Sequence, residues 1–84
     1  MYYIYILRSI VVKKSYIGYT NNVEKRLLEH NSGKSIYTRK YRPWRIIYVE
    51  DFLNETDAIL REKYLKSRAG RKKMKEIFLH SEIV

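Results

Sequence analysis

Residues 3–30, YIYILRSIVVKKSYIGYTNNVEKRLLEH, decide the fold because they predict two strands followed directly by a helix. The first run, residues 2–7, is almost entirely β-branched or aromatic, which is typical of a strand buried on both faces. Side chains alternate along a strand, so Tyr3, Tyr5 and Leu7 are expected on one face. The other face is expected to carry Tyr2, Ile4 and Ile6.

The second strand is expected after a hairpin turn in residues 8–15. Along this strand Tyr16 and Gly18 share one face, opposite Ile17 and Tyr19. A glycine inside a strand weakens it, and it usually marks a bulge or the close approach of another group. Gly18 is therefore the first indication of a site.

The first helix carries two polar residues on its packed side. Asn21 or Asn22 is its expected N-cap, and it ends near Asn31 with Gly33 as the stop. An i, i+3, i+4, i+7 stripe places four residues on one face of the helix. These are Val23, Arg26, Leu27 and His30. An isolated Arg or His in such a place more often pairs with a surface acid or fills space. Two of them one turn apart, beside two tyrosine-rich strands, favour a phosphate site.

The remaining elements complete an α+β fold. A third strand is expected at residues 45–52, and two further helices at residues 54–68 and 71–79. Strict alternation in the third strand would place Ile46 and Tyr48 on one side and Ile47 and Val49 on the other. The predicted order is β-β-α-β-α-α, a small three-stranded antiparallel sheet flanked by helices, in one domain spanning residues 1–84.

The second of the three helices holds a carboxylate in an unexpected place. Glu62 falls on a stripe with Ala58 and Leu65, where an apolar residue would be expected. Burying a lone carboxylate costs several kcal/mol unless a cation or hydrogen bonds meet it. An ordinary i, i+4 pair with Lys66 is the structural alternative, and it contributes only about 0.2–0.5 kcal/mol. The functional interpretation is favoured because it explains the position.

Composition favours a polyanionic partner. Eighteen Lys and Arg against nine Asp and Glu give a formal net charge of +9. Such a field attracts nucleic acid and speeds its association, whereas a membrane surface is a weaker fit because the cations do not lie on one amphipathic helix. The absence of cysteine, of an apolar run near the roughly 18 residues of a membrane span, and of a signal peptide predicts a cytoplasmic protein.

Residues 34–45, KSIYTRKYRPWR, alternate cations with aromatic residues. The cations suit phosphate contacts, and Tyr37 and Tyr41 either stack on unpaired bases or hold the loop to the core. Trp44, beside Pro43, is more often a core anchor. The predicted nucleic-acid contacts are Lys34, Arg39, Lys40, Arg42, Arg45, Lys66, Arg71 and Lys72.

The available chemistry suits phosphodiester hydrolysis. There is no Ser-His-Asp set of credible spacing, no Gly-rich phosphate loop and no His/Cys cluster for zinc. Tyrosine hydroxyls, Arg, His and one inward carboxylate remain. A phenol of pKa near 10 is a poor base at pH 7 unless nearby cations lower that pKa. Mg²⁺ keeps several waters, so one carboxylate and the substrate phosphate are enough to hold it.

The chain resembles the GIY-YIG nuclease superfamily, and more narrowly its small single-domain bacterial branch, which is UPF0213-like. The resemblance covers essentially the whole sequence. The main motif residues, in order, are Tyr3-Ile4-Tyr5, Tyr16-Ile17-Gly18, Arg26, His30 and Glu62. Further segments with similar spelling are Tyr19-Thr20-Asn21, His30-Asn31-Ser32-Gly33, Tyr37-Thr38-Arg39, Arg42-Pro43-Trp44, Leu65-Lys66-Ser67 and Gly70-Arg71-Lys72.

The resemblance implies a role for each motif residue. Tyr5 would be the general base or the nucleophile, with the base favoured, and Tyr16 and His30 would orient the attacking water. Arg26 would stabilise the phosphate. Glu62 would hold a divalent metal ion, Mg²⁺ or Mn²⁺.

Three hypotheses follow. The first is a metal-dependent endonuclease that cleaves DNA with little sequence preference, and the joint presence of the five motif residues favours it. The second is a nucleic-acid-binding module that keeps the nuclease fold without efficient cleavage. It is favoured by the lack of an asparagine in residues 63–84, where many family nucleases have one. The third is a basic subunit whose partner is another protein.

Overall fold

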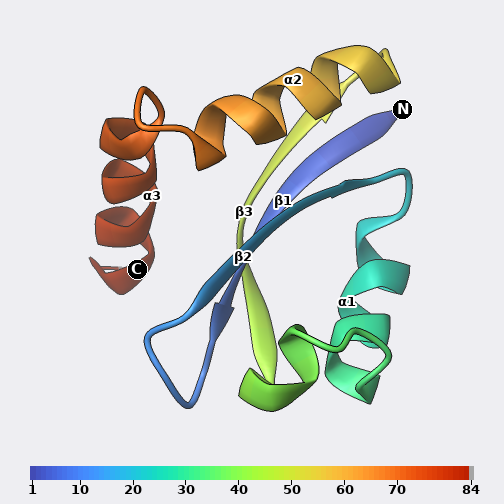
Figure 1. The fold of residues 1–84 in the computed structure, drawn as a ribbon, viewed down its shortest axis with the longest axis vertical. Coiled ribbons are helices and arrows are strands. Elements are labelled where there is room, and N and C mark those ends of the chain that lie inside the picture. The colour runs from blue at the N-terminus through green and yellow to red at the C-terminus, as the bar shows by residue number, and fades with distance from the viewer. Residues whose placement is uncertain (84) are drawn as a thin grey trace.

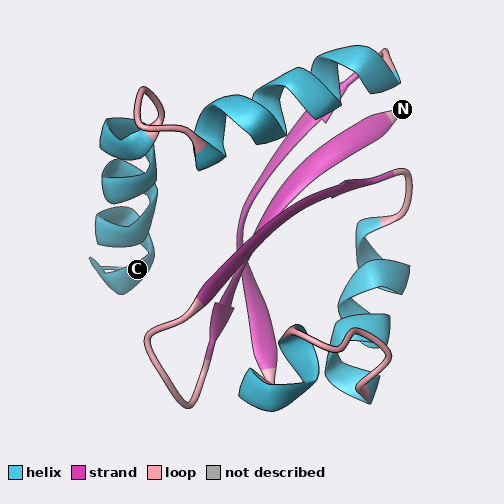
Figure 2. Cartoon of the chain, viewed as in Figure 1, coloured by secondary structure: helices cyan, strands magenta, loops and turns pink. Residues whose placement is uncertain are grey.

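The structure, a computed structural model, describes residues 1–83, with side chains as far as Ser81. Its elements are β1 (Tyr2–Ser9), β2 (Ser15–Thr20), α1 (Val23–Ser32), the 3₁₀ helix η1 (Thr38–Tyr41), β3 (Trp44–Phe52), α2 (Glu55–Lys66) and α3 (Arg71–Ile83). The three strands form one antiparallel sheet in the order β2-β1-β3 (Figure 1, Figure 2). The predicted α+β fold and its element order are confirmed. Val84, the last residue of the predicted domain, lies outside the described residues.

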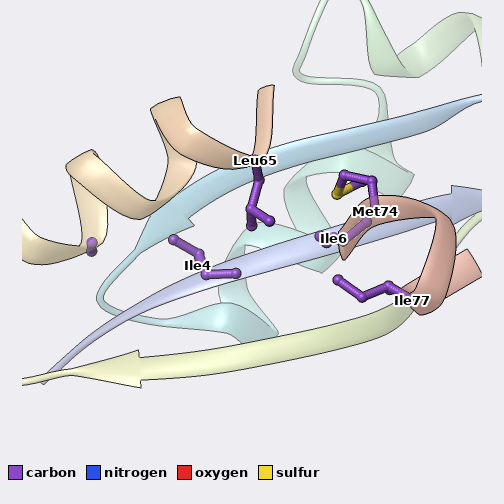
Figure 3. Packing of buried hydrophobic residues seen from close by; sticks show 6 residues of the cluster. Ile4, Ile6, Leu65, Met74 and Ile77 are labelled. Carbon is purple, nitrogen blue, oxygen red and sulfur yellow. The ribbon is translucent and has the colours of Figure 1, made fainter. Parts of the chain in front are cut away.

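The central strand β1 is buried on both faces, as its composition predicted. Ile4 and Ile6 are 0% exposed and pack against α2 and α3. Figure 3 shows Leu65 of α2 and Met74 and Ile77 of α3 directed at these two isoleucines. We call this side of the sheet the α2 face.

The opposite side of the sheet, which we call the α1 face, carries a second cluster. Tyr5, Leu7 and Trp44 form its buried centre, and Val23 and Leu27 of α1 pack against them. Trp44 is 2% exposed, so the expectation that it anchors the core is confirmed. Because side chains alternate along β1, two adjacent residues of one strand serve two separate clusters.

A β-bulge in β3 overturns the strict alternation expected there. Tyr48 pairs with Ile6, but Leu7 pairs with Ile46, so Ile47 is the extra residue of the bulge. Ile47 and Tyr48 consequently both pack on the α2 face, whereas Ile46 packs on the α1 face. Nothing in the β-branched run signals the additional residue.

Capping fixes the first helix. Asn22 is the N-cap of α1 and accepts a hydrogen bond from the Lys25 amide at 3.1 Å. Gly33 ends the helix with a left-handed φ of 88°, as the sequence predicted. These two residues fix the ends of the helix that carries Arg26 and His30.

The later helices differ from their expected bounds. Helix α2 ends at Lys66, because the Ser67 hydroxyl and amide both bond the Tyr64 carbonyl at 2.6 and 3.0 Å and close a turn there. Helix α3 continues to Ile83, four residues past the expected end. Within the part of the chain that the structure describes, no helix is long and apolar enough to cross a membrane.

Candidate active site

The ring of Tyr5 crosses from β1 onto the neighbouring strand, where it lies against Gly18. The two residues are paired in the sheet. A Cβ atom added to Gly18 would lie 2.7 Å from the Tyr5 hydroxyl oxygen and 3.0 Å from a ring carbon of Tyr16. Any larger residue would displace one ring, so the glycine marks a close approach, as expected.

The hydroxyl of Tyr5 is joined to His30 of α1. His30 is 0% exposed, and its Nε2 lies 2.9 Å from the Tyr5 hydroxyl oxygen. Its other ring nitrogen, Nδ1, lies 2.8 Å from Oγ1 of Thr38. Both nitrogens of a buried imidazole are therefore used, and Tyr5, His30 and Thr38 form a continuous hydrogen-bonded chain.

Thr38 was not among the residues predicted for the site. It is 0% exposed and begins η1, and its carbonyl accepts a hydrogen bond from Trp44 Nε1 at 2.7 Å. Asn31 fixes the other side of the loop, because its side chain bonds both the amide and the carbonyl of Trp44, at 2.7 and 3.1 Å. A threonine in a charged, non-periodic loop gives no pattern from which its burial can be inferred. Only the resemblance of Tyr37-Thr38-Arg39 to the family sequence pointed to Thr38.

Arg26, one turn before His30, contacts both an acid and the phenol. Its Nη1 lies 2.7 Å from Oε1 of Glu29, and its side chain is 35% exposed. The pairing with a surface acid, the structural alternative considered for this residue, is thus present. The guanidinium also interacts with the Tyr5 hydroxyl, where its hydrogen bond and charge favour the phenolate.

Burial governs the ionisation of the two central groups. Desolvation raises the pKa of Tyr5 to about 12, assisted by the charges of Tyr16 and Glu62 and opposed by Arg26. Desolvation, together with the Arg26 charge, also lowers the pKa of His30 below its ordinary value of 6.5. At neutral pH Tyr5 is therefore a phenol and His30 a neutral imidazole.

Tyr16 completes the group on the α1 face. Its ring centroid lies 4.7 Å from that of His30 and 6.2 Å from that of Tyr5. The rings continue toward the loop, with Tyr37 at 6.3 Å from Tyr16 and Tyr41 at 5.6 Å from Tyr37. A row of tyrosines thus extends from the Tyr5 hydroxyl to the cationic segment, residues 34–45.

Glu62 approaches this group from α2. Its side chain is 17% exposed, and its Oε2 lies 2.9 Å from Nζ of Lys66. The i, i+4 pair is therefore formed, while the carboxylate also lies near enough to Tyr5 for its negative charge to raise the pKa of the phenol. The two interpretations of Glu62 are compatible, because Lys66 is 52% exposed and free to swing into solvent.

The carboxylate of Glu62 offers oxygen ligands to a hard, partly hydrated cation. No cluster of three or more His, Cys, Asp or Glu side chains able to hold a metal ion occurs among the described residues. A metal that requires a complete protein cage is therefore a poor fit. Mg²⁺ and Mn²⁺ prefer oxygen ligands, and Mg²⁺ usually retains waters, so a single carboxylate beside a substrate phosphate suits them.

The predicted nucleic-acid contacts fall into two groups. All eight side chains are exposed, and five belong to residues 34–45, around η1 and the end of α1. The guanidinium of Arg42 lies against Gly33, at the carbonyl end of α1. Lys66, Arg71 and Lys72 lie at the α2–α3 junction, at the opposite end of the molecule (Figure 1). The structure thus brings together Tyr5, Tyr16, Arg26 and His30 with Glu62 nearby, but not all the cations.

Comparisons with known proteins show a family to which the chain is similar. The GIY-YIG catalytic domain matches residues 1–75. The chain is 40% identical to the UPF0213 protein of Oceanobacillus iheyensis over 90% of this chain and 88% of that protein. It is also 40% identical to the UPF0213 protein of Clostridium perfringens, over 92% and 83% respectively.

A solved structure is similar as well. The solution NMR structure of a UPF0213 protein from Bacillus halodurans is 36% identical, with a TM-score of 0.53, over 94% of this chain and 85% of that one. GIY-YIG proteins form a nuclease family, whose members act on nucleic acids and generally depend on a divalent metal. The chain belongs to the GIY-YIG family, among its UPF0213 members.

Proposed function

We propose that residues 1–84 form a single cytoplasmic domain that hydrolyses phosphodiester bonds in DNA, with little sequence preference. The observation that carries the proposal is the buried chain Tyr5–His30–Thr38, with Arg26 on the Tyr5 hydroxyl and Glu62 nearby. A purely structural cluster has no need of a neutral imidazole bonded to a phenol beside a guanidinium.

The chain of hydrogen bonds suggests how a phenol of high pKa acts as a base. With a pKa of about 12, Tyr5 is ionised in only about one molecule in 10⁵ at pH 7. In the His30 tautomer that carries its proton on Nδ1, Nε2 can only accept, so the phenolic proton of Tyr5 is directed at Nε2, while the nearby Arg26 guanidinium favours the phenolate. The Nδ1 proton of His30 then donates to Thr38.

The proposed step moves two protons. As water attacks phosphorus, its O–H bond breaks and the proton passes to the Tyr5 oxygen, while the original phenolic proton passes to His30 Nε2. The new P–O bond replaces the bond to the leaving oxygen, which is protonated from solvent. His30 later returns its proton to the Tyr5 oxygen, which passes one to solvent. Tyr16, whose ring contacts both residues, orients the attacking water.

Arg26 and Glu62 act on charge. Arg26 donates to the phosphoryl oxygens as negative charge develops on them, after exchanging Glu29 for the substrate. Glu62 would hold Mg²⁺ or Mn²⁺ together with the phosphate. When bound, such an ion supplies Lewis-acid stabilisation of a phosphoryl or leaving oxygen.

A second candidate is a nucleic-acid-binding module that does not cleave. It is favoured by the closed state of the site: Tyr5 is 1% exposed, Arg26 is paired with Glu29, and Glu62 is paired with Lys66. Each reactive group is already satisfied by a neighbour within the chain. Catalysis requires at least the two ion pairs to open.

A cleavage assay separates the two candidates. Labelled duplex, flap and single-stranded DNA and RNA are incubated with Mg²⁺, Mn²⁺ or EDTA. We expect metal-dependent cleavage of DNA that Tyr5→Phe and Glu62→Gln each abolish. The controls Tyr19→Phe and Glu55→Gln, a hydroxyl–carboxylate contact of 3.4 Å on the exposed surface, are expected to retain activity. DNA binding without cleavage of any substrate would establish the second candidate instead.

A further inference from the structure

The turn between β1 and β2 exposes three consecutive aliphatic side chains. Ile10 and Val11 are each 61% exposed and Val12 is 44% exposed. The turn projects beyond the sheet at the end away from α2, at the lower left of Figure 2. Loop tips are usually polar, and three adjacent exposed aliphatics at a projecting tip indicate a contact with another molecule. We call residues 10–12 the hairpin tip.

The hairpin tip is held in one conformation by a buried serine. Ser9 is 6% exposed, and its hydroxyl accepts hydrogen bonds from the amides of Val11 and Val12, both at 3.2 Å. The same hydroxyl donates to the Tyr41 carbonyl at 2.6 Å. The Ile10 amide bonds the Pro43 carbonyl at 3.0 Å. The tip is therefore a pre-formed protrusion attached to the cationic segment.

Cations surround the hairpin tip. The three aliphatic side chains share one open, shallow surface region with Arg8, Lys13 and Arg45. Lys14, next along the turn, places its Nζ 5.5 Å from the Tyr41 ring centroid. An apolar tip with cations beside it complements a ligand whose apolar interior is bordered by phosphates.

We propose that the hairpin tip is a wedge that enters a base step of duplex DNA, while the surrounding cations hold the flanking phosphates. Apolar side chains inserted between base pairs unstack them, and the resulting bend brings more protein surface into contact. A base step that has opened offers apolar stacking faces between two rows of phosphate, which match the tip and its cations. Continuity with residues 34–45 favours DNA over a membrane surface as the occupant.

The position of the tip relates it to the candidate active site. From Tyr5 to Ser9 the strand advances about 13 Å at about 3.3 Å per residue. Successive base pairs are about 3.4 Å apart, so with the strand lying along the duplex the wedge, which lies beyond Ser9, would enter at least about four base steps from the phosphate at Tyr5. This inference rests on the proposed function in taking DNA as the substrate. It predicts a preference for duplexes whose stacking is already interrupted, because unstacking them requires less free energy.

The test measures unstacking without cleavage. Duplexes with 2-aminopurine beside a one-nucleotide gap, and intact duplexes, are titrated with protein in EDTA. We expect the wild-type protein to raise the fluorescence and to bind the gapped duplex more tightly. The double variant Ile10→Ser/Val11→Ser is expected to lose the fluorescence rise and about tenfold in affinity for the gapped duplex. The control is Leu79→Ser on α3, where the leucine is also 61% exposed.

The salt dependence distinguishes a wedge from an electrostatic contact. None of these substitutions changes charge, so the slope of affinity against salt is expected to stay unchanged while affinity falls. An unaltered fluorescence response in the double variant overturns the proposal. The proposal is also overturned if the double variant binds DNA as the wild type does and loses only its binding to phosphatidylglycerol vesicles. If the fluorescence results hold but no DNA is cleaved by the wild type in Mg²⁺, the catalytic proposal fails and the wedge stands.

Discussion

The hydroxyl oxygen of Tyr5 lies 2.9 Å from Nε2 of His30, and this contact joins β1 to α1 across 25 positions of sequence. Both residues are almost completely buried, so water does not compete for the hydrogen bond. Because the pKa of Tyr5 is raised to about 12 and that of His30 is lowered, the proton stays on the phenol at neutral pH. When the Tyr5 oxygen receives a proton from water, the hydrogen bond nevertheless allows the original phenolic proton to pass to Nε2 of His30.

The pH dependence of cleavage tests this relay. If His30 accepts the phenolic proton, the cleavage rate depends on neutral His30, so it should be level above about pH 6.5 and fall only at lower pH, as the pH approaches the lowered pKa of His30. If a free Tyr5 phenolate were the base, the rate would instead rise tenfold per pH unit toward about 12. Initial rates at saturating metal, measured across this range, distinguish the two.

Replacement of His30 is expected to lower the cleavage rate by about 10²–10⁴-fold in His30→Gln, since an amide can bond the phenol but cannot take its proton. The control is His80→Gln, at the exposed histidine of α3. Because His30 acts on the substrate only through Tyr5 in this scheme, the pH profile of the variant is informative as well as its rate. The acidic fall should disappear from the residual activity. A profile unchanged from wild type would contradict the relay.

Acid stability provides an independent measurement on the same histidine. The pKa of His30 is lower in the folded protein than its ordinary value of 6.5, so between these two values the unfolded chain binds more protons. The contribution of neutral His30 to the free energy of unfolding is therefore fully present above about pH 6.5, and it is lost as the pH falls through the pKa of His30 in the folded protein. Urea unfolding from about pH 7.5 down to about pH 5 should show this decline in wild type and a smaller one in His30→Gln.

A methyl group at position 18 should disturb the site without replacing any reactive group. In Gly18→Ala the new Cβ would lie 2.7 Å from the Tyr5 hydroxyl oxygen. The oxygen is attached to a rigid ring and the Cβ to a strand, so neither can move away easily. Overpacking of this kind costs about 1–3 kcal/mol of stability. We expect cleavage to fall with it, because the displaced ring lengthens the bond to His30. Thermal unfolding and single-turnover rates measure the two effects, and a variant with wild-type values for both would contradict the close packing.

The sequence predicted the elements whose pattern is local. Alternation in β1 placed Tyr5 and Ile4 on opposite faces, and the glycine at position 18 correctly indicated a close approach. The sequence did not predict the register shift between β1 and β3 at Ile47, because a bulge is set by pairing between strands distant in sequence. Thr38 was missed for a related reason. It is buried because its loop packs against α1, and a contact of this kind leaves no periodic pattern in the sequence.

The Arg26–Glu29 pair is expected to compete with substrate phosphate. Its 2.7 Å contact occupies the guanidinium that the proposed mechanism needs, and the carboxylate adds negative charge beside the site. Glu29→Gln should therefore tighten DNA binding and lower KM about two- to fivefold, since one unfavourable charge is removed. The loss of the i, i+3 pair costs only about 0.2–0.5 kcal/mol of stability. Glu24→Gln, an exposed acid on the same helix, is the control, and weaker binding by Glu29→Gln would contradict the competition.

Charge reversal in residues 34–45 should reveal which surface meets the phosphates. Arg39→Glu/Arg42→Glu removes four units of charge, so the net charge falls from +9 to +5. If both side chains contact phosphates, the slope of log affinity against log salt should become shallower by about 2. Affinity should drop uniformly across sequences. Lys25→Glu/Lys63→Glu changes net charge equally at exposed positions outside this segment, and its slope should stay near wild type. Equal slopes for the two double variants would mean that net charge alone, and no defined surface, attracts the DNA.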